Sequence, residues 1–226
     1  MPLIAAETAI ADTRRWLERA VIGLNLCPFA KAPHVKGQVH YAVCSGGGRA
    51  ELLAALRSEL QALAAADPDE RETTLLIVPD QLADFLDFND MLDDAEALLD
   101  ELDLAGVLQI APFHPRFQFA GTDQDDITNA TNRSPWPTLH LLREASVDRA
   151  VEAFPEAEAI YEANMATLEK LGSEGWAALD VGPSKTWTRL LPKKELIGHI
   201  RCGPAAPINP KTRCWPNCVP ASRWSC

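Results

Sequence analysis

Three strand-like segments alternate with two helix-length segments in the first half of the chain, and this succession constrains the fold most strongly. The strand patterns lie at residues 39–43, 73–78 and 106–111, and the helix patterns lie at residues 50–66 and 89–102. Residues 73–78 form a nearly continuous apolar run, which is typical of a strand that is buried on both faces. Strands separated by full helices usually pair in parallel through helical crossovers. We therefore predict an α/β fold with a β-α-β-α-β parallel core.

Further helices should pack around this core. Apolar residues recur at three- and four-residue spacing over residues 8–23, and a Ser or Pro opens each of two later helical patterns, at 146–154 and 155–171. An irregular stretch, residues 112–137, follows the third predicted strand, and a short helix is expected in it near residues 123–130. Residues 138–144 fit either a strand or one helical turn.

The net charge changes sign near the end of the chain. The 226 residues carry a formal charge of −11, but residues 1–182 contain 13 basic and 31 acidic side chains, whereas residues 183–226 contain 8 basic and 1 acidic. We predict a single α/β domain over 1–182, followed by a basic tail rich in Pro and Cys. An acidic body repels polyanions, so its composition argues against a nucleic-acid partner. No apolar run approaches the roughly 20 residues of a membrane span, and we expect a cytoplasmic protein without a membrane partner.

The tail shows neither helical nor strand periodicity after about residue 197. We expect it to be disordered or outside the fold. Its four cysteines, which include a C-x3-C pair at Cys214 and Cys218, leave a zinc-dependent contact module as an alternative.

Ligands of open α/β sheets bind beyond the carboxyl ends of the strands, which here indicates the loops at 44–49, 79–80 and 112–117. In the third loop, Pro112 and Pro115 flank His114 closely and stiffen its backbone. A histidine held in this way suits a metal ligand or an acid/base group. The alternative is that His114 only stabilises its loop through a hydrogen bond to a carbonyl.

Two further groups could join such a site. His140 and Glu144 are four residues apart and would share a helix face, as metal-ligand pairs do. Glu144 could instead pair with a neighbouring arginine. Cys27 could form a nucleophile pair or a soft metal site with a histidine, although a free cysteine is more often simply packed.

Candidate substrate-binding residues lie on both sides of the irregular stretch. Arg116 and Arg133 could bind a carboxylate or phosphate through their guanidinium groups, and Asn129 and Asn132 could orient it. For each arginine, the alternative is solvation or pairing with nearby aspartates.

Three separated motifs resemble the bacterial family known as domain of unknown function 1415. They are Asn25-Leu-Cys-Pro-Phe-Ala30, Pro112-Phe-His-Pro-Arg-Phe-Gln-Phe119 and Asn129-Ala-Thr-Asn-Arg-Ser-Pro-Trp-Pro-Thr-Leu-His-Leu-Leu-Arg-Glu144. The resemblance covers about residues 8–180 and implies a mostly cytoplasmic bacterial protein without an established activity. It adds weight to the candidates inside the motifs.

From these observations we predict a small-molecule enzyme with an anionic substrate and a His-centred site. Its catalytic residues would be His114, His140, Glu144 and Cys27. His114, His140 and Glu144 would also suit a transition metal such as iron or zinc. The alternative is a non-catalytic binding or assembly domain in which the same motif residues stabilise the fold.

Overall fold

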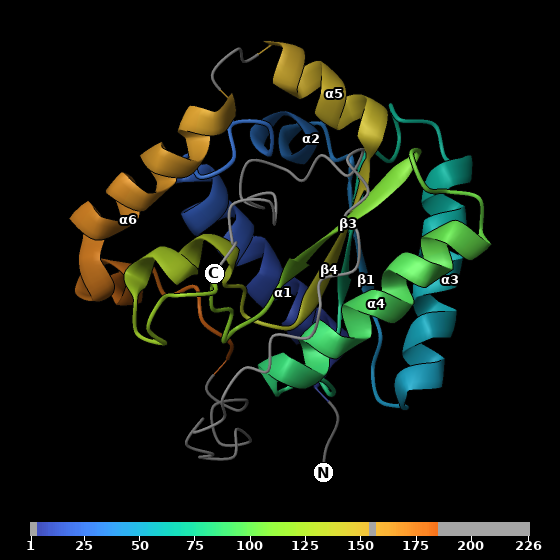
Figure 1. The fold of residues 1–226 in the computed structure, drawn as a ribbon, viewed down its shortest axis with the longest axis horizontal. Coiled ribbons are helices and arrows are strands. Elements are labelled where there is room, and N and C mark those ends of the chain that lie inside the picture. The colour runs from blue at the N-terminus through green and yellow to red at the C-terminus, as the bar shows by residue number, and fades with distance from the viewer. Residues whose placement is uncertain (1–3, 154–156, 185–226) are drawn as a thin grey trace.

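A four-stranded mixed sheet lies at the centre of the molecule (Figure 1). The computed structural model describes residues 4–153 and 157–184, so the predicted tail lies almost entirely outside the described residues. The elements follow in the order α1 (Ala6–Trp16), the π-helix η1 (Leu17–Ile22), α2 (Lys31–Val35), β1 (Val39–Val43), α3 (Arg49–Ala65), β2 (Thr73–Ile77), α4 (Phe85–Glu101), β3 (Leu108–Phe113), the 3-10 helix η2 (Ile127–Asn132), β4 (Thr138–Arg143), α5 (Glu144–Ala153) and α6 (Ala157–Ala178).

The sheet has the strand order β1-β2-β4-β3, which confirms the α/β class but not a wholly parallel core. β1 and β2 pair in parallel, whereas β4 is antiparallel to both β2 and β3 and separates them. In register, His140 of β4 lies between Leu75 of β2 and Ala111 of β3. β4 takes this inner position because both of its faces are buried, with Leu139 and Leu141 at 0% exposure on one face and Thr138 and Leu142 at 0% and 7% on the other.

β1, β2 and β3 nevertheless run in the same direction, since β4 is antiparallel to both of its neighbours. Their carboxyl ends therefore meet at one edge, and the predicted loops do approach one another there. Gln81 Nε2 donates to the Gly46 carbonyl at 2.5 Å, and His114 Nε2 lies 2.9 Å from the Leu82 carbonyl oxygen. The glycine-rich loop is a connector, because its Gly48 N–H is bound by Glu51 in a helix-capping arrangement.

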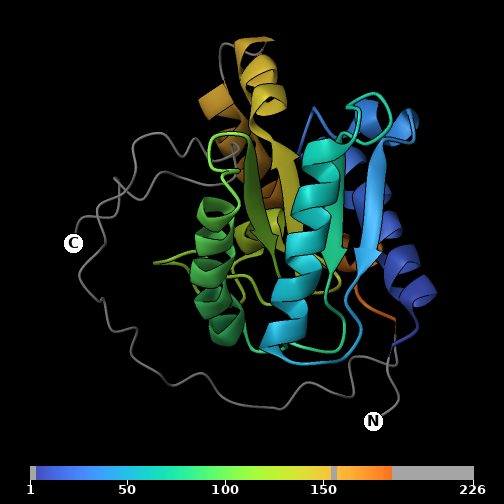
Figure 2. The same ribbon diagram turned by 90° about the vertical axis from the view of Figure 1, so that its right-hand side faces the viewer.

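The sheet is covered on both faces, as the two views show (Figures 1 and 2). α3 and α4 lie against one face, where the leucine stripe of α3 joins Leu76, Leu139 and Leu141 in the largest core cluster. On the opposite face, α1 and η1 pack through residues such as Trp16, whose ring lies 5.2 Å from that of Phe113. This second face carries the candidate site.

Two expectations about the helices are confirmed in detail. The first helical segment, predicted over residues 8–23, ends at Ile22 with Gly23 as its C-cap, although its last six residues form a π-helix. Gly172, at φ 66°, interrupts α6 at the predicted helix end. Among the described residues, no helix is long and apolar enough to cross a membrane.

Candidate functional site

A cavity of about 130 Å³ lies between the second face of the sheet and the helices that cover it. Its walls are mostly apolar and come from α1, η1, α5 and the strands, including Trp16, Phe113 and Val147. Three residues singled out in the sequence, Cys27, Asn132 and His140, line this space. Cys27 and His140 are 113 residues apart in the sequence, so only the tertiary fold brings these residues together.

His140 has one ring nitrogen fixed by a short hydrogen-bond chain. Its Nε2 lies 2.7 Å from Thr73 Oγ1, and the same hydroxyl donates to the Leu141 carbonyl at 2.7 Å. A hydroxyl has a single proton, so Thr73 must accept from His140, and Nε2 carries the hydrogen. Nδ1 then bears the lone pair. Nδ1 has no hydrogen-bond partner within the described part of the chain, and burial lowers the pKa of His140 to about 4, so the ring is neutral at pH 7.

Cys27 lines the same cavity as a neutral thiol. The residue as a whole is partly exposed, but its thiol is desolvated, which raises its pKa to about 12 despite the opposing effect of the backbone at Phe29 and Ala30. A thiolate is the reactive form of cysteine. Cys27 is therefore poorly suited to be a nucleophile in this state and serves here as part of the wall.

The two asparagines have different surroundings. Asn129 is fully buried, and its side chain binds Phe119, Thr122 and Asp123, so that it organises the loop before η2. Asn132 is 1% exposed and lines the cavity. Its Nδ2 lies 3.4 Å from the Pro112 carbonyl oxygen, whereas its Oδ1 is buried without a hydrogen-bond partner among the described residues.

His114 lies outside the cavity and is completely buried. Its Nδ1 accepts from the Arg116 N–H at 3.0 Å, so Nε2 must be the donor to the Leu82 carbonyl. Burial lowers the pKa of His114 to about 4. Both ring nitrogens are therefore hydrogen-bonded. His114 stabilises its loop through a hydrogen bond to a carbonyl, which was the alternative to a metal-binding or acid/base role.

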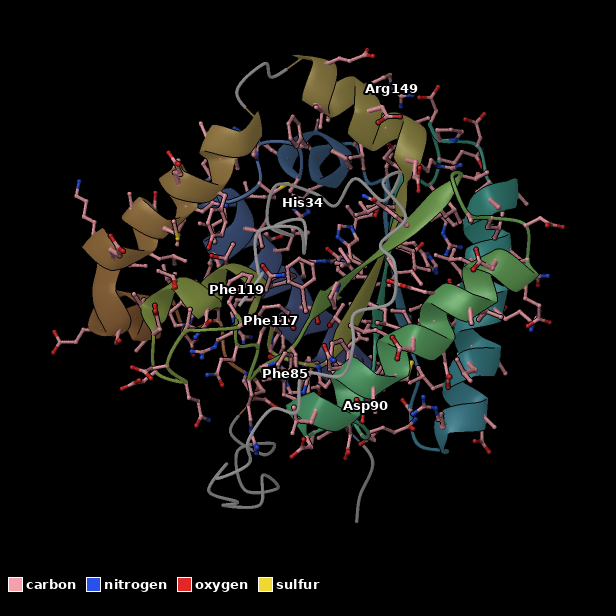
Figure 3. The ribbon with its side chains drawn as sticks, in the orientation of Figure 1. His34, Phe85, Asp90, Phe117, Phe119 and Arg149 are labelled. Carbon is pink, nitrogen blue, oxygen red and sulfur yellow. The ribbon has the colours of Figure 1, made fainter. Side chains whose placement is uncertain are left out.

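Aromatic rings enclose His114 on the side of α4. The Phe88 and Phe85 ring centroids lie 5.1 and 5.4 Å from its imidazole. Phe85 also contacts Phe117, which contacts Phe119 at 5.0 Å, and these three rings follow one another across Figure 3. This packing excludes water from the imidazole and explains the direction of its pKa shift.

The candidate arginines do not line the cavity that the described residues form. Arg133 Nε donates to the Phe117 carbonyl at 3.2 Å and its guanidinium also binds the Gln124 carbonyl, so it stabilises the irregular stretch. Arg116 lies next to His114 on the loop beyond β3. Neither predicted anion-binding arginine therefore shares this cavity with His140 and Asn132.

Glu144 opens α5 immediately after β4, so it does not share a helix face with His140. Burial and the nearby Asp148 raise its pKa, and it lies outside the cavity lining. Across residues 4–153 and 157–184, no three His, Cys, Asp or Glu side chains gather closely enough to hold a metal ion. His114, His140 and Glu144 therefore do not form a common metal centre in this part of the chain.

Two residues of the site were missed in the sequence. Thr73 orients His140. As a polar residue at the start of a buried strand, Thr73 could have been recognised from the sequence. Arg143 contributes to the cavity wall, while its guanidinium binds the carbonyls of Leu63 and Ala66 at the end of α3 and that of Arg71 shortly before β2. That contact between distant segments leaves no trace in local sequence.

Comparison with known proteins gives one positive result. No curated protein and no solved structure matches the chain. The family described as "Protein of unknown function (DUF1415)" matches residues 8–178, which include Cys27, Asn132 and His140. The match spans most of the described residues, and the chain therefore belongs to this family.

Proposed function

We propose that the protein is a small-molecule enzyme whose substrate enters the cavity and in which His140 Nδ1 accepts a proton. The observation that carries this proposal is the oriented imidazole. Thr73 binds one nitrogen and leaves the other as a lone pair in a mostly apolar space. Histidines held by a partner on one nitrogen commonly act as general bases through the other.

The size of the cavity supports a small substrate. At about 130 Å³ it is comparable with engineered protein cavities that bind benzene. Its walls offer apolar contact over most of the surface, with a few polar atoms that could orient a ligand, as is usual for small-molecule sites. Compared with the sequence-based hypothesis, the proposed site keeps His140, Asn132 and Cys27 and replaces His114 as its centre.

Ligand binding and ligand conversion can be tested in one experiment, with one variant for each. A metabolite extract is passed over the immobilised protein, and bound compounds are identified by mass spectrometry. Wild type should retain a small molecule that Ala150→Phe, which fills the cavity from α5, does not retain. Arg57→Met, which changes a surface ion pair with Glu101, is the matched control and should retain it equally.

The retained compound is then incubated with wild type and with His140→Gln. Glutamine keeps a donor for Thr73 but lacks the ring lone pair, so binding should persist while conversion falls by about two to four orders of magnitude. Equal retention by wild type and Ala150→Phe would contradict the small-molecule site. Retention without conversion by wild type would favour the alternative, a non-catalytic binding domain.

A further inference from the structure

Two residues that line the cavity, Asn132 and His140, each have a hydrogen-bond acceptor without a partner in the described structure. Asn132 Oδ1 is buried and has no partner in the described structure, while the amide nitrogen of the same side chain faces the Pro112 carbonyl. His140 Nδ1 is a second acceptor, because the proton of this ring is on Nε2. A ligand that fits these two atoms must offer hydrogen-bond donors.

The charges around the cavity do not favour an anion, because one acidic and one basic residue, Glu72 and Arg143, both line it. Glu72 lines the space together with the two acceptors, and all three would repel a carboxylate or phosphate. Arg143 is the cationic residue among the described residues that line the wall. Its Nη2 is committed to three backbone carbonyls, whereas its Nε is buried without a hydrogen-bond partner there. Arg116 and Arg133 do not line this cavity.

A cationic donor is also disfavoured, for a different reason. A protonated amine would lose most of its hydration among the apolar walls, which costs several kcal/mol. Glu72 would offset part of this cost, but Arg143 lines the same space and repels a cation. A neutral hydroxyl loses far less, and it supplies the donor that the buried Asn132 oxygen lacks. An unsatisfied buried acceptor costs about 1–3 kcal/mol, so a ligand that pairs with it gains affinity.

We propose that the cavity binds a small neutral alcohol, whose hydroxyl donates to Asn132 Oδ1 and whose hydrocarbon part, about the size of a six-membered ring, fills the apolar walls. This inference rests on the proposed function, because both place the ligand in the same cavity. Asn132 selects the ligand in this scheme, whereas His140 performs the proton transfer.

The test measures, by isothermal titration calorimetry, the affinities of four ring compounds that differ in one polar group. Cyclohexanol should bind about tenfold more tightly than cyclohexanone, cyclohexanecarboxylate or cyclohexylammonium, because it alone is a neutral donor. In Asn132→Leu, which has a similar volume but no acceptor, cyclohexanol and cyclohexanone should bind equally. Arg57→Met should keep the wild-type order.

The outcomes distinguish the two proposals. If cyclohexanone, the carboxylate or the ammonium compound binds wild type as tightly as cyclohexanol, the inference is wrong and the cavity remains a binding site. If none of the four binds, both the inference and the proposed small-molecule site fail. Should Asn132→Leu not fold by circular dichroism, the order of affinities in the wild-type protein decides by itself.

Discussion

His114 joins two loops at the carboxyl edge of the sheet by donating from Nε2 to the Leu82 carbonyl, 2.9 Å away. Leu82 has a φ of 55°, a left-handed conformation that a leucine seldom adopts, and it stands shortly before α4. The bond therefore holds an unfavourable backbone turn in place, while the other ring nitrogen fixes the Arg116 N–H. His114 is a structural residue of the strand edge.

His114→Ala should lower the free energy of unfolding by about 3 kcal/mol, because it leaves buried backbone groups unpaired and a void among the phenylalanines. Urea unfolding followed by circular dichroism measures the change. His40→Ala is the control, since the His40 side chain is 47% exposed, and its effect should stay within about 0.5 kcal/mol. Similar effects of the two substitutions would contradict the structural role of His114.

Acidification should destabilise the protein well before most carboxylates are protonated. Burial lowers the pKa of both His114 and His140 from 6.5 to about 4, so between these values the unfolded chain binds protons that the folded chain does not. The stabilisation is complete above about pH 6.5 and is lost as the pH falls toward 4. Between pH 7 and pH 5 we expect a loss of about 2 kcal/mol for each histidine.

The variant His140→Gln isolates one histidine in this experiment. Its unfolding free energy should fall by about 2 kcal/mol less than that of wild type over the same pH interval. Equal pH dependences in the two proteins would show that His140 has the same pKa in the folded and the unfolded chain. That result would contradict a buried imidazole that stays neutral at the site.

Cys27 should react slowly with iodoacetamide. Its pKa is raised from 9.0 to about 12, which reduces the thiolate population near neutral pH by about a thousandfold and slows labelling in the same proportion. Peptide-level mass spectrometry distinguishes Cys27 from the other cysteines, and the same protein in urea supplies the reference rate. Labelling of the folded protein at the reference rate would instead restore Cys27 as a candidate nucleophile.

Arg143→Met should lower the free energy of unfolding by about 2–3 kcal/mol. The substitution keeps the aliphatic stem but removes the donors that bind the Leu63 and Ala66 carbonyls at 2.7 Å, at the end of α3. Arg143→Lys should recover part of the loss. Arg57→Met, which breaks an exposed ion pair, should change the unfolding free energy by less than about 0.5 kcal/mol, and an equally small effect at Arg143 would refute its capping role.

The main elements of the fold could be predicted because their signals are local. The continuous apolar run of β2 and the leucine spacing of α3 are set by neighbours within a few residues, as is the end of a helix at Gly172. The insertion of β4 between β2 and β3 could not, since the pattern of β4 shows that it is buried but not which edges it pairs with.

The sequence by itself determined the α/β class, the positions of most helices and strands, and the membership of Cys27, Asn132 and His140 in distinctive motifs. Only the tertiary structure decided which of the candidate residues share a cavity. His114 and His140 look alike in sequence, each being a histidine beside or within an apolar strand. They differ because strand pairing directs His140 to a face that the helices cover incompletely, whereas His114 is enclosed by aromatic rings and has both nitrogens bonded. Long-range packing makes that distinction, and no local pattern encodes it.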